Sequence, residues 1–249
     1  MGWKLSAIII QNPSSINHEE LLHNLGYEQL TRIEDEYFEV AKYRYKNEVY
    51  IGTYKNNLII CNSDIVWDFW KQEEQMAEKI LKRLFPNSEI CAVGLLSTVN
   101  FWGFSVINNG QRIRVRAGGG DNERNHIEIG LPLEEEKKLL NQSLIDENGE
   151  RVYFLNDDNN PSSEDQVGEL FVFAICERYF GVPLDHDDTL MFETKLAGYS
   201  YHKKEKSESN QIPPLINILK GIGLITELIL KVAIAKLLKK TKTMPQKEE

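Results

Sequence analysis

The alternation of apolar and polar residues is most regular in the segment FWGFSVINNGQRIRVR, which covers residues 101–116. Its centre is Asn109-Gly110, and Asn-Gly between two alternating runs is the strongest short-range sign of a β-hairpin. Both central residues of a type I′ turn need a positive φ, which Asn and Gly adopt most easily. A two-residue turn predicts an apolar face on which Val106 lies opposite Ile113, Phe104 opposite Val115 and Trp102 opposite Ala117.

The second face of this predicted hairpin carries arginines opposite small or neutral residues. Alternate residues of a strand project from one face about 6.8 Å apart. A guanidinium presents a fixed fork of donors, so such a row is a candidate site for an anionic ligand or an acidic partner. The alternative is a solvated face whose arginines pair with acids such as Glu134–Glu136, because charge runs usually lie on the surface. In this register the arginine row consists of Arg112 opposite Ile107, Arg114 opposite Ser105 and Arg116 opposite Gly103.

Other periodic segments predict the remaining elements. Asn17 and Gly26 have the properties of a helix N-cap and stop around residues 17–25. Ser163 with Gln166, and then Gly181, bound a helix over 163–180 in the same way. Further helices are expected over 73–85 and 133–140, and strands over 4–10, 37–45, 48–54, 57–61, 90–96, 127–129 and 151–155.

This order of elements predicts an α+β domain over residues 1–200. Its sheet would be largely antiparallel and rich in hairpins, with helices packed on one face. The helices over 17–25 and 73–85 are each followed by three predicted strands. The domain therefore has the pattern expected of two duplicated halves, each with one helix and three strands.

The composition changes after residue 200. Residues 201–214 are polar and charged and end in Pro213-Pro214, which is typical of a linker. Residues 215–242 predict a detached amphipathic or membrane-associated helix, and residues 243–249 a disordered tail.

The helix predicted over 215–242 allows three interpretations. At about 100° per residue, one narrow face of the helix carries the polar residues Asn217, Lys220, Glu227 and Lys231, and apolar residues cover the rest. It could lie in the plane of an anionic membrane, dock on the domain or on a second copy, or span a bilayer. Spanning is disfavoured because charges near the middle of a span are costly. In the membrane-surface interpretation the contacts to headgroups come from Lys220, Lys231, Lys236, Lys239 and Lys240.

Charge and cysteine usage narrow the classes of partner. The net charge is −9, with +4 in residues 212–249 and −13 in residues 1–211. An acidic domain argues against non-specific nucleic-acid binding, and a basic tail on it suggests a separate partner. The three cysteines lie in apolar runs without CxxC spacing, which indicates reduced, buried thiols and a cytoplasmic protein. They are Cys61, Cys91 and Cys176.

The search for catalytic chemistry is mostly negative. The sequence lacks the phosphate-loop, zinc-protease, nucleophile-elbow and dinucleotide-binding motifs. The loop over 118–121 does not lead into an apolar helix, so a mobile or tightly turned loop explains it better than a phosphate site. The segment Asp185–Asp188 has the composition of a metal site, but no second His or Cys lies at ligand spacing. His126 could act as an acid–base group, although no nucleophile pairs with it. No metal and no cofactor are expected.

Two segments resemble a family of uncharacterised bacterial proteins, a domain of unknown function. One is residues 97–116, with Trp102-Gly103-Phe104 and Asn109-Gly110 leading to Arg114 and Arg116. The other is the predicted helix from Gly168 with its exit at Gly181–Asp185. The resemblance covers residues 1–200, implies a bacterial cytosolic setting and carries no activity.

Three functions remain open. The first is a non-enzymatic binding or regulatory module, held at the inner membrane surface by residues 215–242. The second is an enzyme that binds a small anionic substrate through the arginine row and uses His126 as its acid–base group. The third is a toxin-neutralising, immunity-type protein whose acidic domain covers a basic partner.

Overall fold

The computed structural model describes residues 2–43, 47–119, 126–155 and 160–203. The predictions for residues 204–249, including the membrane-associated helix, its lysines and the disordered tail, lie outside the described residues. Within the described ranges the chain forms an α+β fold around one large antiparallel sheet.

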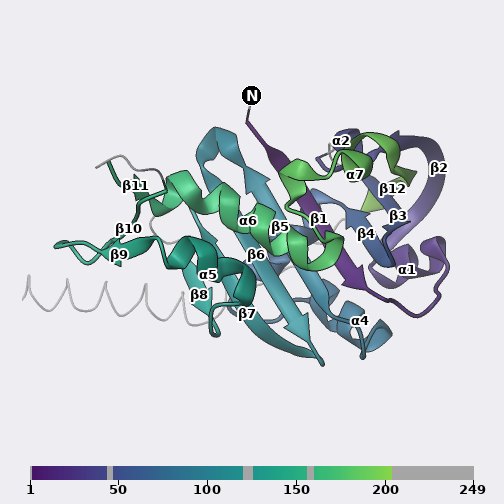
Figure 1. Cartoon of the computed structure of the whole chain (residues 1–249). Helices are drawn as coiled ribbons and strands as arrows, with labels where there is room; N and C mark the ends of the chain where they lie inside the picture. Colours follow the sequence, from purple (N-terminus) through teal and green to yellow (C-terminus); the bar gives the residue numbers. More distant parts are fainter. Residues whose placement is uncertain (1, 44–46, 120–125, 156–159, 204–249) are drawn as a thin grey trace, which may run out of the picture. The chain divides into compact units, whose positions relative to one another are not determined.

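The sheet has nine strands in the order β2-β12-β3-β4-β1-β5-β6-β7-β8, with every pair antiparallel (Figure 1). The strands are β1 (Lys4–Gln11), β2 (Tyr27–Tyr37), β3 (Glu48–Tyr54), β4 (Asn57–Cys61), β5 (Ile90–Leu96), β6 (Phe101–Asn108), β7 (Gln111–Gly118), β8 (Ile127–Ile129) and β12 (Lys195–Lys203). A small separate sheet is formed by β9 (Ser143–Ile145), β10 (Arg151–Tyr153) and β11 (Ser162–Ser163).

Helices cover both faces of the large sheet, so the prediction that they pack on one face is wrong. The first face carries α2 (Phe38–Ala41), α5 (Glu134–Leu140), α6 (Glu164–Phe180) and α7 (Asp188–Glu193). The second face carries α1 (His18–Asn24), α3 (Ser63–Val66), the 3-10 turn η1 (Trp67–Trp70) and α4 (Met76–Leu84).

The central strand β1 shows why both faces need a cover. Leu5, Ala7 and Ile9 join the core under α6, whereas Ile8 and Ile10 join the core under α1 and α4. A strand that is apolar on both faces must be buried on both faces. The continuous apolar run at the start of the chain was therefore the sign of a second helical layer.

Several local predictions are confirmed. The β6–β7 hairpin turns at Asn109 and Gly110 as predicted, both with positive φ. The strands predicted over 48–54 and 57–61 form the β3–β4 hairpin, whose turn residues Lys55 and Asn56 also have positive φ. Helix α6 begins with the predicted capping box of Ser163 and Gln166 and ends at Gly181 with φ of 79°.

The edge of the sheet near β2 was predicted incorrectly. Residues 38–41 form the helix α2 where the sequence predicted a strand over 37–45, and the strand before it, β2, was missed. Most of β2 is exposed or half-buried, so its residues lack the alternation that marks a strand with one buried face. Its neighbour β12 was also missed, and it continues to Lys203, into the range predicted as a linker.

The predicted duplication stays a prediction. Both α1 and α4 lie on the second face, and each precedes three strands in the chain. However, β12 separates β2 from β3, whereas β5, β6 and β7 are direct neighbours. None of the helices in the described ranges combines the length and apolar composition needed to cross a bilayer.

Candidate functional site

A β-bulge in β7 changes the register of the central hairpin. Next to the turn, Ile107 lies opposite Arg112 as predicted. The next pair is Val106 with Arg114, so Ile113 is the extra residue. The predicted pairing of Val106 with Ile113, and every predicted pair beyond it, is therefore wrong by one residue.

The bulge divides the arginine row between the two faces of the sheet. Arg114 and Arg116 lie opposite Val106 and Phe104 and project into the apolar core under α6. Arg112 stays on the opposite face. Both inward-facing arginines are almost completely buried, at 0% and 2% exposure. The prediction of one face bearing all three arginines is wrong. The alternative is wrong about solvation, but its pairing of the arginines with an acid of the 134–136 segment is confirmed at Glu136.

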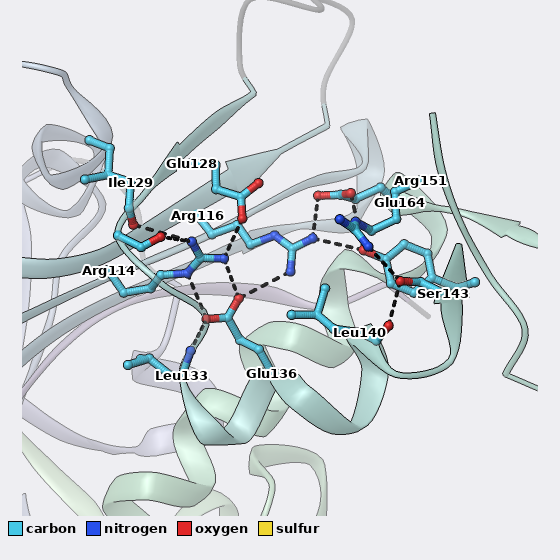
Figure 2. A network of polar contacts seen from close by, with 12 residues as sticks. Arg114, Arg116, Glu128, Ile129, Leu133, Glu136, Leu140, Ser143, Arg151 and Glu164 are labelled. Atoms are coloured by element: carbon cyan, nitrogen blue, oxygen red, sulfur yellow. Dashed lines mark hydrogen bonds and ion pairs between the residues drawn. The ribbon is translucent and has the colours of Figure 1, made fainter. Parts of the chain in front are cut away.

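Arg114 is held by a bidentate ion pair with Glu136 of α5. Its Nε donates to Glu136 Oε1 at 2.8 Å and its Nη2 to Oε2 at 2.7 Å. The same Nη2 also donates to Glu128 on β8 at 2.8 Å, and Nη1 donates to the carbonyl of Gly130 at 2.9 Å. Figure 2 shows this guanidinium in contact with groups of β8 and of α5. Its donors are therefore engaged within the protein.

Arg116 connects β7 to the helix α6 and the small sheet. Its Nη1 donates to Glu136 at 3.3 Å, and its Nη2 donates to Glu164 and to the Tyr153 hydroxyl, both at 2.9 Å. The guanidinium also lies 4.1 Å from the ring centroid of Phe171, which is a cation–π contact. The pair of arginines therefore fastens α5, α6 and β10 to the edge of the large sheet (Figure 2).

The charges in this network affect one another's titration. Burial raises the pKa of Tyr153 to about 12, although the charge of Arg116 opposes this shift. Partial burial alone would raise the pKa of Glu128, but the hydrogen bond from Arg114 lowers it below its usual value. Two arginines face three carboxylates, those of Glu128, Glu136 and Glu164. The three carboxylates neutralise the two arginines, so the network offers no excess positive charge to an anionic ligand.

Arg112 on the other face is engaged as well. Its Nε donates to Glu78 of α4 at 2.9 Å, and its Nη2 forms an ion pair with the same carboxylate. Its Nη1 donates to the carbonyl of Lys71 at 2.6 Å. Arg112 therefore ties the segment that follows η1 to β7 and α4.

His126 lies apart from the three arginines, in the lining of an open cavity of about 650 Å³. Trp67 and Trp70 of η1, Phe101 of β6 and Ile129 of β8 also line this cavity, and none of the three arginines does. His126 is half-exposed, and its Nε2 is 3.8 Å from Asp165. The structure therefore does not join His126 to the arginine row.

The aromatic side chains of this cavity pack against one another. The ring centroids of Trp67 and Phe101 are 4.4 Å apart, and those of Trp70 and Phe101 are 5.4 Å apart. The rings are too close together for a cation to fit between them, so they do not form an aromatic cage. They form a continuous aromatic surface, which is called the shelf below. The Trp70 indole rests on the paired residues Gly94 and Gly103, where an added Cβ would lie 2.6 Å and 2.8 Å from it.

The acidic segment at 185–188 has a structural role at Asp187. Its carboxylate accepts the backbone N–H of Leu190 at 3.0 Å and the hydroxyl of Tyr54 at 2.8 Å. Asp187 is thus the N-cap of α7 and a link to β3. Among the residues that the structure describes, no group of three or more acidic, His or Cys side chains could hold a metal ion.

Sequence reasoning missed most of the residues that complete these sites. Glu136 was named only as a possible surface partner, and Glu78, Tyr153 and Glu164 were not considered. The dense aromatic run WDFW at 67–70 was the available signal for the shelf.

The lysines predicted to contact a membrane or a partner, Lys220, Lys231, Lys236, Lys239 and Lys240, lie outside the described residues. Comparison of the chain with protein-family models, characterised proteins and solved structures gives no match.

Proposed function

We propose that this chain is a non-enzymatic binding or regulatory module, held at an anionic membrane surface by residues 215–242. The observation that carries the first part is the internal neutralisation of the arginine row. Arg112 pairs with Glu78, Arg114 with Glu136, and Arg116 with Glu136 and Glu164. The side chains best suited to clamp an anionic substrate hold the fold together instead.

The energy needed to free these arginines argues against the enzyme hypothesis. Removing one partner of a buried ion pair costs about 3–5 kcal/mol. A substrate bound by Arg114 would have to displace Glu136, which is itself 1% exposed, and leave that carboxylate buried without its partner. His126 also lines a cavity that none of the three arginines lines. The geometry therefore supports binding through another surface better than catalysis at this row.

The proposed tether rests on the sequence of residues 215–242. This segment carries lysines on a polar face and an otherwise apolar surface, the pattern of helices that lie in a membrane interface. Each lysine near an anionic surface contributes about 1 kcal/mol, so several together give stable attachment. The bacterial inner membrane would supply such a surface.

Vesicle flotation of the full chain tests the tether. We expect binding to vesicles of phosphatidylcholine and phosphatidylglycerol, little binding to phosphatidylcholine alone, and release at high salt. Replacing Lys220, Lys231, Lys236, Lys239 and Lys240 by glutamate should abolish flotation. Resistance to extraction by alkaline carbonate would indicate that the helix spans the membrane and does not lie on its surface. A full-length protein that ignores anionic vesicles would refute the tether.

A toxin-neutralising function is a second candidate, favoured by the charge of the domain. Residues 1–203 carry a net charge of −13, and such a field speeds association with a basic protein and makes it salt-dependent. We would purify the chain together with a basic protein encoded beside it. A complex that forms rapidly at low salt, and that suppresses the partner's toxicity, would support this function.

A further inference from the structure

A groove between α5, α6 and the 3-10 turn η4 (Leu184–His186) is separate from the sites described above. Its volume is about 570 Å³, which is within the range of ligand-binding clefts. Helices α5 and α6 lie beside each other on the first face of the sheet (Figure 1). The apolar residues that line the groove include Leu139, Leu170 and Ala174.

The rim of this groove is acidic. Glu134 and Glu135 of α5, Glu177 of α6 and Asp185 of η4 line it, against the basic residues Lys138 and Arg178; His186 lines it too. Glu134 is already paired with Lys137. The lining residues therefore carry more negative than positive charge, as does the domain as a whole.

One carboxylate in the groove is incompletely neutralised. Arg178 donates to Glu89 at 2.6 Å and 3.0 Å, and to Glu135 at 3.1 Å, so one cation serves two carboxylates. Glu89 also accepts the hydroxyl of Tyr179 at 2.8 Å. Glu135 Oε2 is buried and has no hydrogen-bond partner among the described residues. A buried acceptor of this kind gains from a donor supplied by a ligand.

We propose that this groove binds a basic amphipathic helix of a partner protein. The apolar face of that helix would contact Leu170 and Ala174. One of its lysines or arginines would donate to Glu135 once this carboxylate turns its free oxygen toward the groove. A third helix laid along two neighbouring helices is a common mode of peptide recognition, read through apolar side chains at helical spacing. The inference rests on the proposed binding function and names the chemistry of the partner.

The test is a titration of the full chain, without vesicles, with a synthetic 18-residue helical peptide that has leucines on one face and lysines on the other. The second peptide replaces every lysine by glutamate. We expect the basic peptide to bind and the acidic one not to bind. The titration is repeated with the variant in which the five C-terminal lysines are replaced by glutamate. The result is then independent of the vesicle experiment, so the groove proposal and the membrane tether can fail separately.

Two substitutions in the groove, each with a matched control, give the decisive comparison. Glu135→Gln removes a charge-assisted hydrogen bond and should weaken binding roughly 10- to 100-fold. Its control, Glu150→Gln, makes the same charge change on an exposed turn. Leu170→Ser should weaken binding about 3- to 10-fold, whereas Leu144→Ser changes a comparably exposed leucine on β9. Both controls should stay within about twofold of the parent chain.

Folding of the variants is checked by circular dichroism. Glu135→Gln keeps an acceptor for Arg178, which also retains its ion pair with Glu89, so the free protein should lose little stability. Equal losses for Glu135→Gln and Glu150→Gln would overturn the proposal, because they would indicate long-range charge attraction alone. Binding of spermidine that depends on Glu135, with peptide binding insensitive to Leu170, would also overturn it and indicate a small cation site.

Discussion

Replacing Glu136 by glutamine should strongly destabilise the protein. The amide oxygen still accepts the backbone N–H of Leu133, so the start of α5 keeps its cap. The charge is lost, and an NH2 group replaces the oxygen that accepts from Arg114 and Arg116. Arg114 and Arg116 remain buried, with Glu128 and Glu164 as their only anionic partners in the described network. Breaking a buried pair costs about 3–5 kcal/mol. Because two carboxylates remain, we expect about 3 kcal/mol.

The assay is urea unfolding followed by tryptophan fluorescence, with a thermal scan beside it. For a domain of this size about 3 kcal/mol corresponds to a fall in Tm of roughly 6–12 °C. The control is Glu134→Gln, which changes an exposed pair with Lys137 and should alter stability by less than about 0.5 kcal/mol.

A double-mutant cycle separates the ion pair from other effects of the substitution. Arg114→Met removes the charge that Glu136 neutralises, so the second substitution should cost less in its presence. We expect a coupling energy of at least about 1 kcal/mol. A loss below about 1 kcal/mol for Glu136→Gln, or strict additivity with Arg114→Met, would refute the view that this network carries buried charge.

Three further predictions concern the core. Gly94→Ala should displace the Trp70 indole, because the new Cβ would lie 2.6 Å from it, and should cost about 1–3 kcal/mol with a red shift in fluorescence. The folded state raises the pKa of Tyr153 from 10 to about 12, so Tyr153 ionises first in the unfolded chain. The free energy of unfolding should therefore fall between pH 10 and about pH 12, and Tyr153→Phe should make this fall less steep. Burial raises the pKa of all three thiols, so Ellman's reagent at pH 8 should modify none of them before denaturant is added: Cys61, Cys91 and Cys176.

Local features of the fold could be predicted from the sequence because their causes are local. The turn at Asn109-Gly110 follows from two neighbouring residues, and the start of α6 follows from Ser163 and Gln166. The strand β2 could not be found in this way, because it is an edge strand whose polar residues show no alternation. Its existence depends on a partner, β12, that lies far away in the chain.

The prediction of the candidate site was wrong because of a single residue. The extra residue Ile113 in β7 shifts the register by one, and a shift of one moves each following side chain to the other face. Arginine is tolerated inside only because Glu136 and Glu164 arrive from later segments to neutralise it. The identity of Arg114 and Arg116 was visible in the sequence, but their environment is a property of the whole fold.

The position of β12 has a consequence for how the protein is made. Strand β2 leaves the ribosome well before its hydrogen-bonded neighbour β12, which lies at residues 195–203. Residues 27–37 must therefore wait until β12 has left the exit tunnel. A nascent chain halted before residue 195 would leave β2 unpaired and the outer edge of β3 open, both prone to wrong partners. Completion of the sheet thus depends on residues 195–203, which emerge shortly before the apolar, lysine-rich segment that follows them.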